Sequence, residues 1–443
     1  MKVILFFMVL LISGLTLAAP FESTYKPRGH ESTLIKGASI FDGAGRLWRE
    51  ADLLIQDGKV RKIGNKLDQK AGVILDASDK WITPGIIDVH SHLGVYPSPA
   101  ISSTSDGNES TSPNTANVWA EHSVWPQDPQ FSLALAGGVT TMQILPGSAN
   151  LFGGRGVTIK NVPSRTVQGM KFPSAPHGLK MACGENPKRV YGSRKSAPST
   201  RMGNVAGYRA EWLKAVEYRD KWRNYDPDGE KPRPSRDLRM ETLVGVLDGE
   251  IIVHNHCYRA DEMATLIEVS KEFGYKIGTF HHAVESYKIA DLLAEEEICS
   301  AMWADWWGFK LEAFDGIQQN IALVENAGAC AIVHSDSARD IQRLNQEASK
   351  ARSAGIRMGI DTSKEDAIRW ITLNAAKSLG IEKVTGSLEP GKAADLVIWS
   401  HDPFSVYSKA EKVFIDGYLY FDRMTDKKPV TDFALEQLTE VGP

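Results

Sequence analysis

Polar side chains that can bind a proton or a metal ion stand at the ends of apolar segments of this chain. His90 and His92 close "ITPGIIDVHSHLG" and would project to the same side of an extended strand, because residues i and i+2 share a face. Imidazoles and a carboxylate that meet at one point are what Zn²⁺ and similar divalent ions prefer. Four segments end in this way: 82–94 with His90 and His92, 250–258 with His254 and His256, 275–283 with His281 and His282, and 329–337 with Asp336.

The elements that must position these residues alternate between strand and helix patterns. Asp128 and Pro129 are typical of a helix start, and "ADEMATLIEVSKEFG" separates two of the histidine segments. Repeated βα units imply a parallel sheet, and no glycine-rich nucleotide fingerprint follows the first strand. We therefore predict an α/β fold with a (β/α)₈ TIM-like barrel. The carboxyl ends of its strands form one face, which would bring the histidine segments and Asp336 together.

Both ends of the chain differ from this middle. Residues 31–83 and 385–425 read as short strands with Asp-Gly turns, which fits a small antiparallel sheet. We predict a small β-sandwich domain built from both chain ends, around a barrel over residues 84–384. Residues 426–443 are predicted to be a C-terminal tail.

The N-terminus resembles that of an exported protein. Lys2 precedes an apolar run over residues 3–12, which passes into "SGLTLAAP", so we expect a signal peptide over residues 1–19. The run is shorter than the roughly 20 residues that a membrane span needs. We expect a secreted or periplasmic protein that is not bound to a membrane after cleavage.

The charge balance excludes some partners. The chain has 51 Lys and Arg against 55 Asp and Glu, a net charge of −4, and this indicates no nucleic acid partner. A small-molecule substrate is expected, and homo-oligomerisation stays open. Residues 186–240 hold 14 Lys and Arg against 7 Asp and Glu. This basic insertion is interpreted as a solvated helical face, with a lid for acidic substrates as the alternative.

Four cysteines lie at positions 183, 257, 299 and 330, and none belongs to a CxxC pattern. They are too few for a fold built on disulfides, so we expect small buried apolar side chains. Export would permit a bridge, which the spacing does not assign.

Two further stretches bear on the barrel mouth. "PGSANLFGGRG", residues 146–156, lacks the Gly-Lys-Ser/Thr ending of a phosphate loop and is predicted to be a barrel loop. "MWADWWGF", residues 302–309, would either line an apolar pocket or pack in the core.

These motifs together resemble the amidohydrolase superfamily, in particular its imidazolonepropionase-like and peptidase-like branches. "PGIIDVHSH", the later histidine strands, "HSDS" and "GSLEPGKAADLVIW" carry the resemblance over nearly the whole mature chain. It implies one or two divalent metal ions, with Zn²⁺ favoured. It also implies that His90, His92 and Asp336 are ligands, together with one histidine from each of the fifth and sixth strands.

The resemblance also guides the choice among neighbouring residues. "HCYRADEM" and "TFHHA" match the relatives' patterns at His256 and His282, with His254 as an alternative and His281 facing the opposite way. For the fourth strand, some relatives use a glutamate and others a carboxylated lysine. Glu185 is favoured here over Lys180, which the match places one residue out of register and facing outward. Tyr258 matches a tyrosine near the substrate carboxylate in peptidase-like relatives.

The function implied is hydrolysis of a C–N bond in an amide, cyclic amide or dipeptide-like substrate by a metal-activated water. Asp336 would act as the general base and then the general acid. Two alternatives stay open, namely a deaminase with the same metal site and a binding protein without catalysis. The sequence does not identify the substrate.

Overall fold

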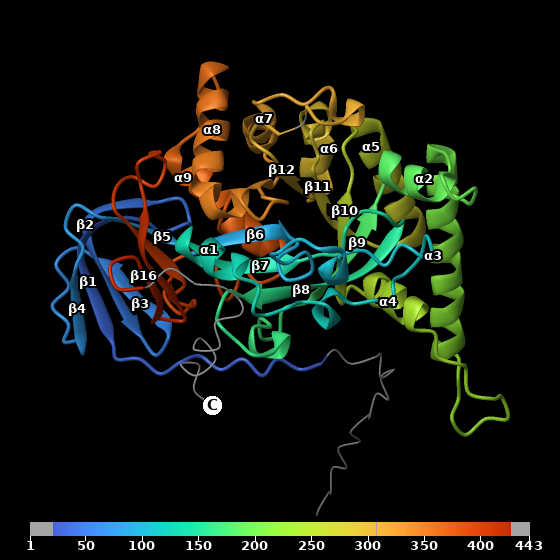
Figure 1. The fold of residues 1–443 in the computed structure, drawn as a ribbon, viewed down its shortest axis with the longest axis horizontal. Coiled ribbons are helices and arrows are strands. Elements are labelled where there is room, and N and C mark those ends of the chain that lie inside the picture. The colour runs from blue at the N-terminus through green and yellow to red at the C-terminus, as the bar shows by residue number, and fades with distance from the viewer. Residues whose placement is uncertain (1–20, 307, 427–443) are drawn as a thin grey trace, which may run out of the picture.

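The central element of the structure, a computed structural model that describes residues 21–306 and 308–426, is an eight-stranded barrel. The predicted signal peptide lies outside the described residues, as does the predicted tail except Asp426. The barrel strands, in the order in which they pair (Figure 1), are β6 (Ile86–Ser91), β7 (Val139–Ile144), β8 (Phe152–Lys160), β9 (His177–Ala182), β10 (Ile251–His256), β11 (Ile277–His281), β12 (Cys299–Met302) and β13 (Ala331–Val333).

The third strand departs from the predicted parallel arrangement. β8 runs antiparallel to both of its neighbours, β7 and β9, whereas the other neighbouring pairs of β6 to β13 are parallel. β7 and β8 are joined by a short connection, which suffices only between antiparallel strands. The prediction of a loop over 146–156 is therefore wrong from Phe152 onward. A Cβ at Gly154 would lie 2.4 Å from the Val118 carbonyl oxygen, so this strand needs a glycine where the backbones approach.

The barrel closes between β6 and β13 through a few specific hydrogen bonds. Buried Asp88 on β6 accepts hydrogen bonds from the backbone N–H of Ser335, at 3.2 Å, and from its hydroxyl. The Asp336 N–H donates to the His90 carbonyl at 3.1 Å. Both strands also bond to the segment between α9 (Lys364–Arg369) and α10 (Leu373–Ser378), where the carbonyls of residues 370 and 371 accept from the N–H groups of residues 333 and 87. The residues that follow β13 are thus held directly opposite the end of β6.

A second sheet combines strands from both ends of the described chain, as the blue and red strands on the left of Figure 1 show. One continuous apolar core contains barrel residues together with Phe41, Val397, Trp399 and Val413 from this sheet. The predicted domain boundaries stay predictions. The strands of this sheet are β1 (Thr33–Phe41), β2 (Leu47–Gln56), β3 (Lys59–Gly64), β4 (Val73–Asp76), β5 (Trp81–Pro84), β14 (Leu396–Trp399), β15 (Ala410–Ile415) and β16 (Tyr418–Asp422).

Helices lie between and around the barrel strands (Figure 1). The basic insertion is largely helical, and its longest helix, α3, packs Trp212 against Phe152 of β8. The α-helices are α1 (Gln130–Ala136), α2 (Glu185–Gly192), α3 (Arg201–Arg223), α4 (Leu238–Leu247), α5 (Ala260–Phe273), α6 (Ala290–Glu295), α7 (Asn320–Asn326), α8 (Leu344–Arg357), α9 (Lys364–Arg369) and α10 (Leu373–Ser378). Short 3-10 turns are η1 (Ser102–Thr104), η2 (Ala120–His122), η3 (Val167–Gly169), η4 (Ser286–Ile289), η5 (Leu311–Ala313) and η6 (Asp340–Arg343).

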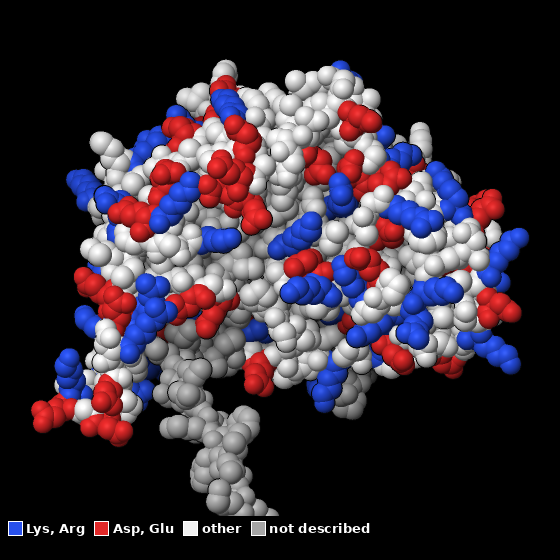
Figure 2. All heavy atoms as spheres, turned by 180° about the vertical axis from the view of Figure 1, so that it is seen from behind, with Lys and Arg blue, Asp and Glu red and all other residues white. Residues whose placement is uncertain are grey.

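The surface shows mixed charge. On the face drawn in Figure 2, acidic and basic side chains are interspersed, and basic residues of the insertion form ion pairs with acidic neighbours, as Arg209 does with Glu272. Among residues 21–306 and 308–426, no helix combines the length and the apolar character needed to cross a bilayer.

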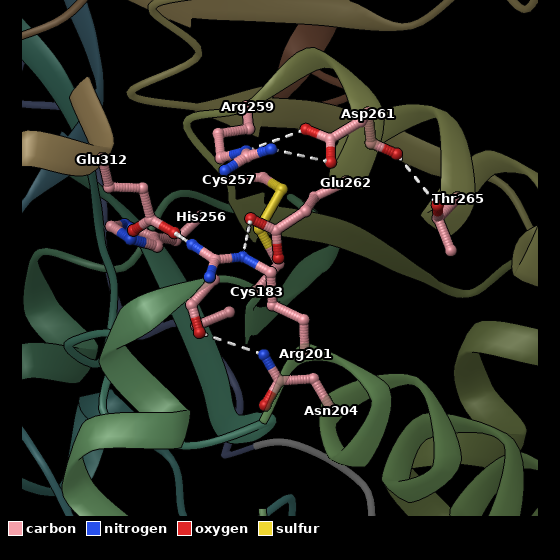
Figure 3. Close-up of a disulfide and its surroundings, with 12 residues drawn as sticks. Cys183, Arg201, Asn204, His256, Cys257, Arg259, Asp261, Glu262, Thr265 and Glu312 are labelled. Carbon is pink, nitrogen blue, oxygen red and sulfur yellow. Dashed lines mark hydrogen bonds and ion pairs between the residues drawn. A yellow bond between two sulfur atoms is a disulfide. The ribbon is translucent and has the colours of Figure 1, made fainter. Parts of the chain in front are cut away.

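The cysteines form two disulfides, so the expectation of four unbridged side chains is wrong. Cys183 pairs with Cys257 and Cys299 pairs with Cys330. Each bond joins residues of neighbouring strands or their ends, which brings thiols distant in sequence within bonding distance. The first bond ties the ends of β9 and β10 beside His256, as Figure 3 shows.

Removal of the Cys183–Cys257 bond by a Cys183→Ala, Cys257→Ala double variant should lower the free energy of unfolding by about 2–5 kcal/mol, because the unfolded chain gains freedom. Urea unfolding measures the change. The matched Cys299→Ala, Cys330→Ala variant opens a loop of 31 rather than 74 residues and should cost less in the chain-entropy description. A non-reducing peptide map of the wild-type protein that finds free thiols would contradict both assignments.

Candidate metal centre

The ends of β6 and β13 place two histidines and a carboxylate together. Nε2 of His92 lies 3.2 Å, and Nε2 of His90 lies 3.6 Å, from Oδ1 of Asp336. His92 donates from Nδ1 to the Leu145 carbonyl at 2.8 Å, which leaves its Nε2 lone pair toward Asp336. Ligand atoms of these three residues lie within 4.8 Å of one another.

Two more histidines complete the inner wall of this group. His282 and His334 form a second cluster with His90, again with ligand atoms within 4.8 Å of one another. His282 lies just past β11 in a left-handed conformation, with φ +57°. Strand alternation ends at this residue, so both His281 and His282 face the inside of the barrel. The expectation that His281 points the opposite way is therefore wrong.

His256 lies beside this group without joining either cluster. Its ring centroid is 5.0 Å from that of His282, and its Nε2 is 3.3 Å from Nδ2 of Asn186. The Cys183 N–H donates to the His256 carbonyl at 2.9 Å, so β9 and β10 stay paired up to this point.

Burial keeps these histidines neutral. It lowers the pKa of His90, His256 and His282 well below the usual 6.5, and that of His334 to about 4. Burial opposes ionisation of Asp336, but its contact with His92 and the positive charge of Lys180 hold its pKa below the usual value. The group therefore presents imidazole lone pairs and one carboxylate at neutral pH.

Lys180 lies inside the barrel, so the expectation that it faces outward is wrong. Leu179 and Met181 belong to the apolar core, and strand alternation turns Lys180 to the other side. Its Nζ is 3.3 Å from His90 Nε2 and donates to the Pro146 carbonyl at 2.9 Å. Burial lowers the pKa of this ammonium to about 8.

Glu185 is placed differently from the sequence expectation. It begins α2 after Gly184, and its carboxylate is 3.6 Å from Lys310 Nζ. Among the described residues, no hydrogen bond or ion pair connects the Glu185 side chain to a histidine of the group. The structure thus brings together His90, His92, His282, Asp336 and Lys180, with His256 adjacent and Glu185 turned toward Lys310.

Aromatic side chains border the histidine group. Trp303 stacks on His282, with ring centroids 4.5 Å apart, and belongs to a small apolar cluster with Tyr258. Lys310 Nζ lies 5.1 Å from the centroid of the Tyr258 ring and donates to Asn186 Oδ1 at 2.9 Å. Of the tryptophans in "MWADWWGF", Trp303 therefore borders the histidine group and is also packed.

The residues present fit a divalent metal ion. Nδ1 atoms of His256, His282 and His334 are buried and have no hydrogen-bond partner among the described residues. Unpaired polar atoms in such a place cost free energy unless a ligand satisfies them. Neutral imidazoles and a carboxylate are a donor set typical of Zn²⁺ sites.

Sequence reasoning missed His334 as a member of this group. A signal was available, because His334 and Asp336 have the same i, i+2 spacing as His90 and His92.

Comparison with known proteins finds similarity to amidohydrolases. A sequence model described as "Amidohydrolase family" matches residues 216–420. The chain is 31% identical over 439 residues to "Amidohydrolase tasK" of Hapsidospora irregularis, a match that covers 90% of this chain and 44% of that protein, so the chain spans less than half of this relative. An "Imidazolonepropionase" of Rhizobium rhizogenes is 22% identical over 428 residues, 87% of this chain and 92% of that protein. The crystal structure of an amidohydrolase from Thermotoga maritima MSB8 is 38% identical, covers 88% of this chain and 100% of that chain, and has a TM-score of 0.81.

The positions of Lys180 and Glu185 lead to a test of the fourth-strand ligand. If Lys180 is carboxylated on Nζ, Lys180→Met should weaken metal binding by about 10-fold or more, since a ligand is lost. Glu185→Gln serves as the matched variant and should change metal affinity little. Competition with a chromophoric chelator measures both. Unchanged or tighter binding by Lys180→Met would show that Lys180 remains an ammonium, whose charge repels the ion.

Proposed function

This chain belongs to the amidohydrolase family, and we propose that it is a metal-dependent hydrolase of a C–N bond in an amide, cyclic amide or dipeptide-like small molecule. The observation that carries the proposal is the convergence of three histidines, two of them buried, on one carboxylate, Asp336. Such a cluster would be costly to fold without a ligand.

We assign the metal to this cluster, with Zn²⁺ as the favoured ion. His90, His92, His282 and Asp336 would hold it, with His334 and His256 beside it and Lys180 as a second bridging point if it is carboxylated. When bound, such an ion polarises a substrate carbonyl and lowers the pKa of a coordinated water. Whether one or two ions bind depends on Lys180.

Asp336 moves the proton in this proposal. Its Oδ1 faces His92 Nε2 at 3.2 Å and its Oδ2 faces His282 Nε2 at 3.7 Å. The side chain is 27% exposed, so solvent reaches it. Asp336 takes a proton from the attacking water and delivers it to the leaving nitrogen, as a general base and then a general acid.

Tyr258 and Lys310 would bind the substrate. The Lys310 ammonium is half-buried, and burial lowers its pKa by disfavouring the charge. A substrate carboxylate beside it would supply a second negative partner in addition to Glu185. Lys310 connects to His256 through Asn186, so a carboxylate bound here lies next to the metal cluster. We therefore favour N-acyl amino acids and dipeptides over neutral cyclic amides.

We also propose that the chain is exported. The signal-peptide pattern over residues 1–19 and the two disulfides both favour an oxidising compartment outside the cytoplasm.

The role of Asp336 can be tested with Asp336→Asn. The amide keeps the size and some coordinating ability of the carboxylate but cannot accept the proton, so turnover should fall about 10²–10⁴-fold while metal stays largely bound. Steady-state kinetics and metal analysis on the same sample measure the two effects. Asp340→Asn is the control, because Asp340 pairs with Ser337 and Arg343 rather than with the histidine group. A metal-loaded Asp336→Asn protein with nearly normal turnover would refute the mechanism.

The substrate class can be tested with Lys310→Met. Hydrogen bonds to charged groups contribute about 1.5–3 kcal/mol, so kcat/KM for substrates with a free carboxylate should fall roughly 10- to 100-fold. Their amidated analogues should be affected little. Lys276→Met is the matched control, since Lys276 is exposed and its ion pair with Glu297 is long, with 3.9 Å between Nζ and Oε2. An equal loss for both substrate classes would show that Lys310 has no part in carboxylate recognition.

A further inference from the structure

A line of hydrogen bonds continues from His90 into the barrel, away from Asp336. Nδ1 of His90 lies 3.0 Å from Nδ1 of His281, and Nε2 of His281 lies 3.0 Å from Nδ1 of His254. Nε2 of His254 lies 3.2 Å from Nε2 of Gln143. The histidines are fully buried and Gln143 is 1% exposed. We call His281, His254 and Gln143 the histidine relay.

The barrel makes room for this relay at one glycine. A Cβ on Gly178 of β9 would lie 2.6 Å from Gln143 Nε2 and 2.7 Å from His254 Cδ2. Such distances are shorter than real side chains tolerate, so β9 can pass the relay only with glycine at this position. The close approach indicates that the side chains of the relay are closely packed against β9 in a defined arrangement.

Each link of the relay has a direction. A neutral imidazole carries one N–H and one lone pair, so a nitrogen that donates obliges the other nitrogen to accept. If His90 has its lone pair on Nε2, on the side of Asp336, its Nδ1 carries the hydrogen and donates to His281. His281 then donates from Nε2 to His254, and His254 donates from Nε2 to Gln143.

Gln143 decides whether this direction can be completed. It must accept with Oε1, which is now buried without a hydrogen-bond partner, while its amide nitrogen faces His254. A half-turn of the terminal amide exchanges the two atoms. With the nitrogen facing His254, every link runs the other way, and His90 ends with a hydrogen on Nε2 that blocks coordination.

We propose that His281, His254 and Gln143 are positioning residues, which hold His90 in the tautomer whose Nε2 lone pair faces the side of Asp336. The proposal rests on the metal site proposed above. Hydrogen-bond partners behind a ligating histidine fix its ring and tautomer, and their loss typically weakens metal binding about 10- to 100-fold. The relay would extend this control across four barrel strands, with the orientation of the Gln143 amide coupled to the state of His90.

Two variants of His281 separate the hydrogen bond from the packing. His281→Phe keeps a ring of similar size but removes the acceptor for His90, so Zn²⁺ affinity should fall about 10- to 100-fold. His281→Asn can place Oδ1 near the position of Nδ1, and should recover most of the affinity although its side chain is smaller. His177→Phe is the control, because His177 is buried at the opposite end of β9 and should leave the affinity unchanged. Equal losses for His281→Phe and His281→Asn would contradict the relay.

The tautomers can also be observed in the unmodified protein. In full-length protein labelled with ¹⁵N-histidine and loaded with Zn²⁺, long-range ¹H–¹⁵N spectra should show His90 protonated at Nδ1, and both His281 and His254 at Nε2. Removal of Zn²⁺ should change these signals together. A loaded protein with His281 protonated at Nδ1 overturns the relay alone, whereas wild-type protein that binds no divalent ion overturns the metal site and the relay together.

Discussion

The site depends on how the barrel closes between its first and last strands. No continuous ladder joins β6 to β13; instead, Asp88 accepts from Ser335 and the Asp336 N–H donates to the His90 carbonyl. Burial raises the pKa of Asp88 to about 7, although these hydrogen bonds act in the opposite direction. The same contacts that close the barrel therefore set the position of Asp336 opposite His90 and His92. A shift of one residue at this seam would separate the carboxylate from the histidines.

Departures from regular strand geometry turn two of the candidate ligands inward. His282, directly after β11, and Asp336, three residues after β13, both have positive φ, +57° and +50°. Residues with side chains adopt this conformation at a cost that the surrounding structure must offset. The change of backbone conformation at His282 turns the side chains of two adjacent residues, His281 and His282, to the inside of the barrel. His282 then lies beside Asp336, and His281 contacts Nδ1 of His90.

The neighbouring strands β9 and β10 together position the polar side chains inside the barrel. Lys180 pairs in register with His254, so β9 supplies the ammonium beside His90 while its Gly178 leaves space for the relay. The Cys183–Cys257 bond ties the ends of the same two strands next to His256. Around this interior, apolar residues such as Leu179 and Val253 face the helices. A buried polar group is tolerated where its hydrogen-bond partners are held in place, and β9 and β10 hold several of these partners.

The sequence by itself determined the chemistry and the broad architecture. Histidines at i, i+2 after an apolar run, repeated at later strand ends, predicted a barrel and placed His90, His92, His282 and Asp336 among the candidates, because strand period and side-chain type are local properties. Only the tertiary structure decided the direction of β8, the pairing of the cysteines, the inward position of Lys180 and the inclusion of His334. These depend on which strands become neighbours, on their register and on backbone angles at single residues such as His282. None of these is encoded in the local pattern of polar and apolar residues.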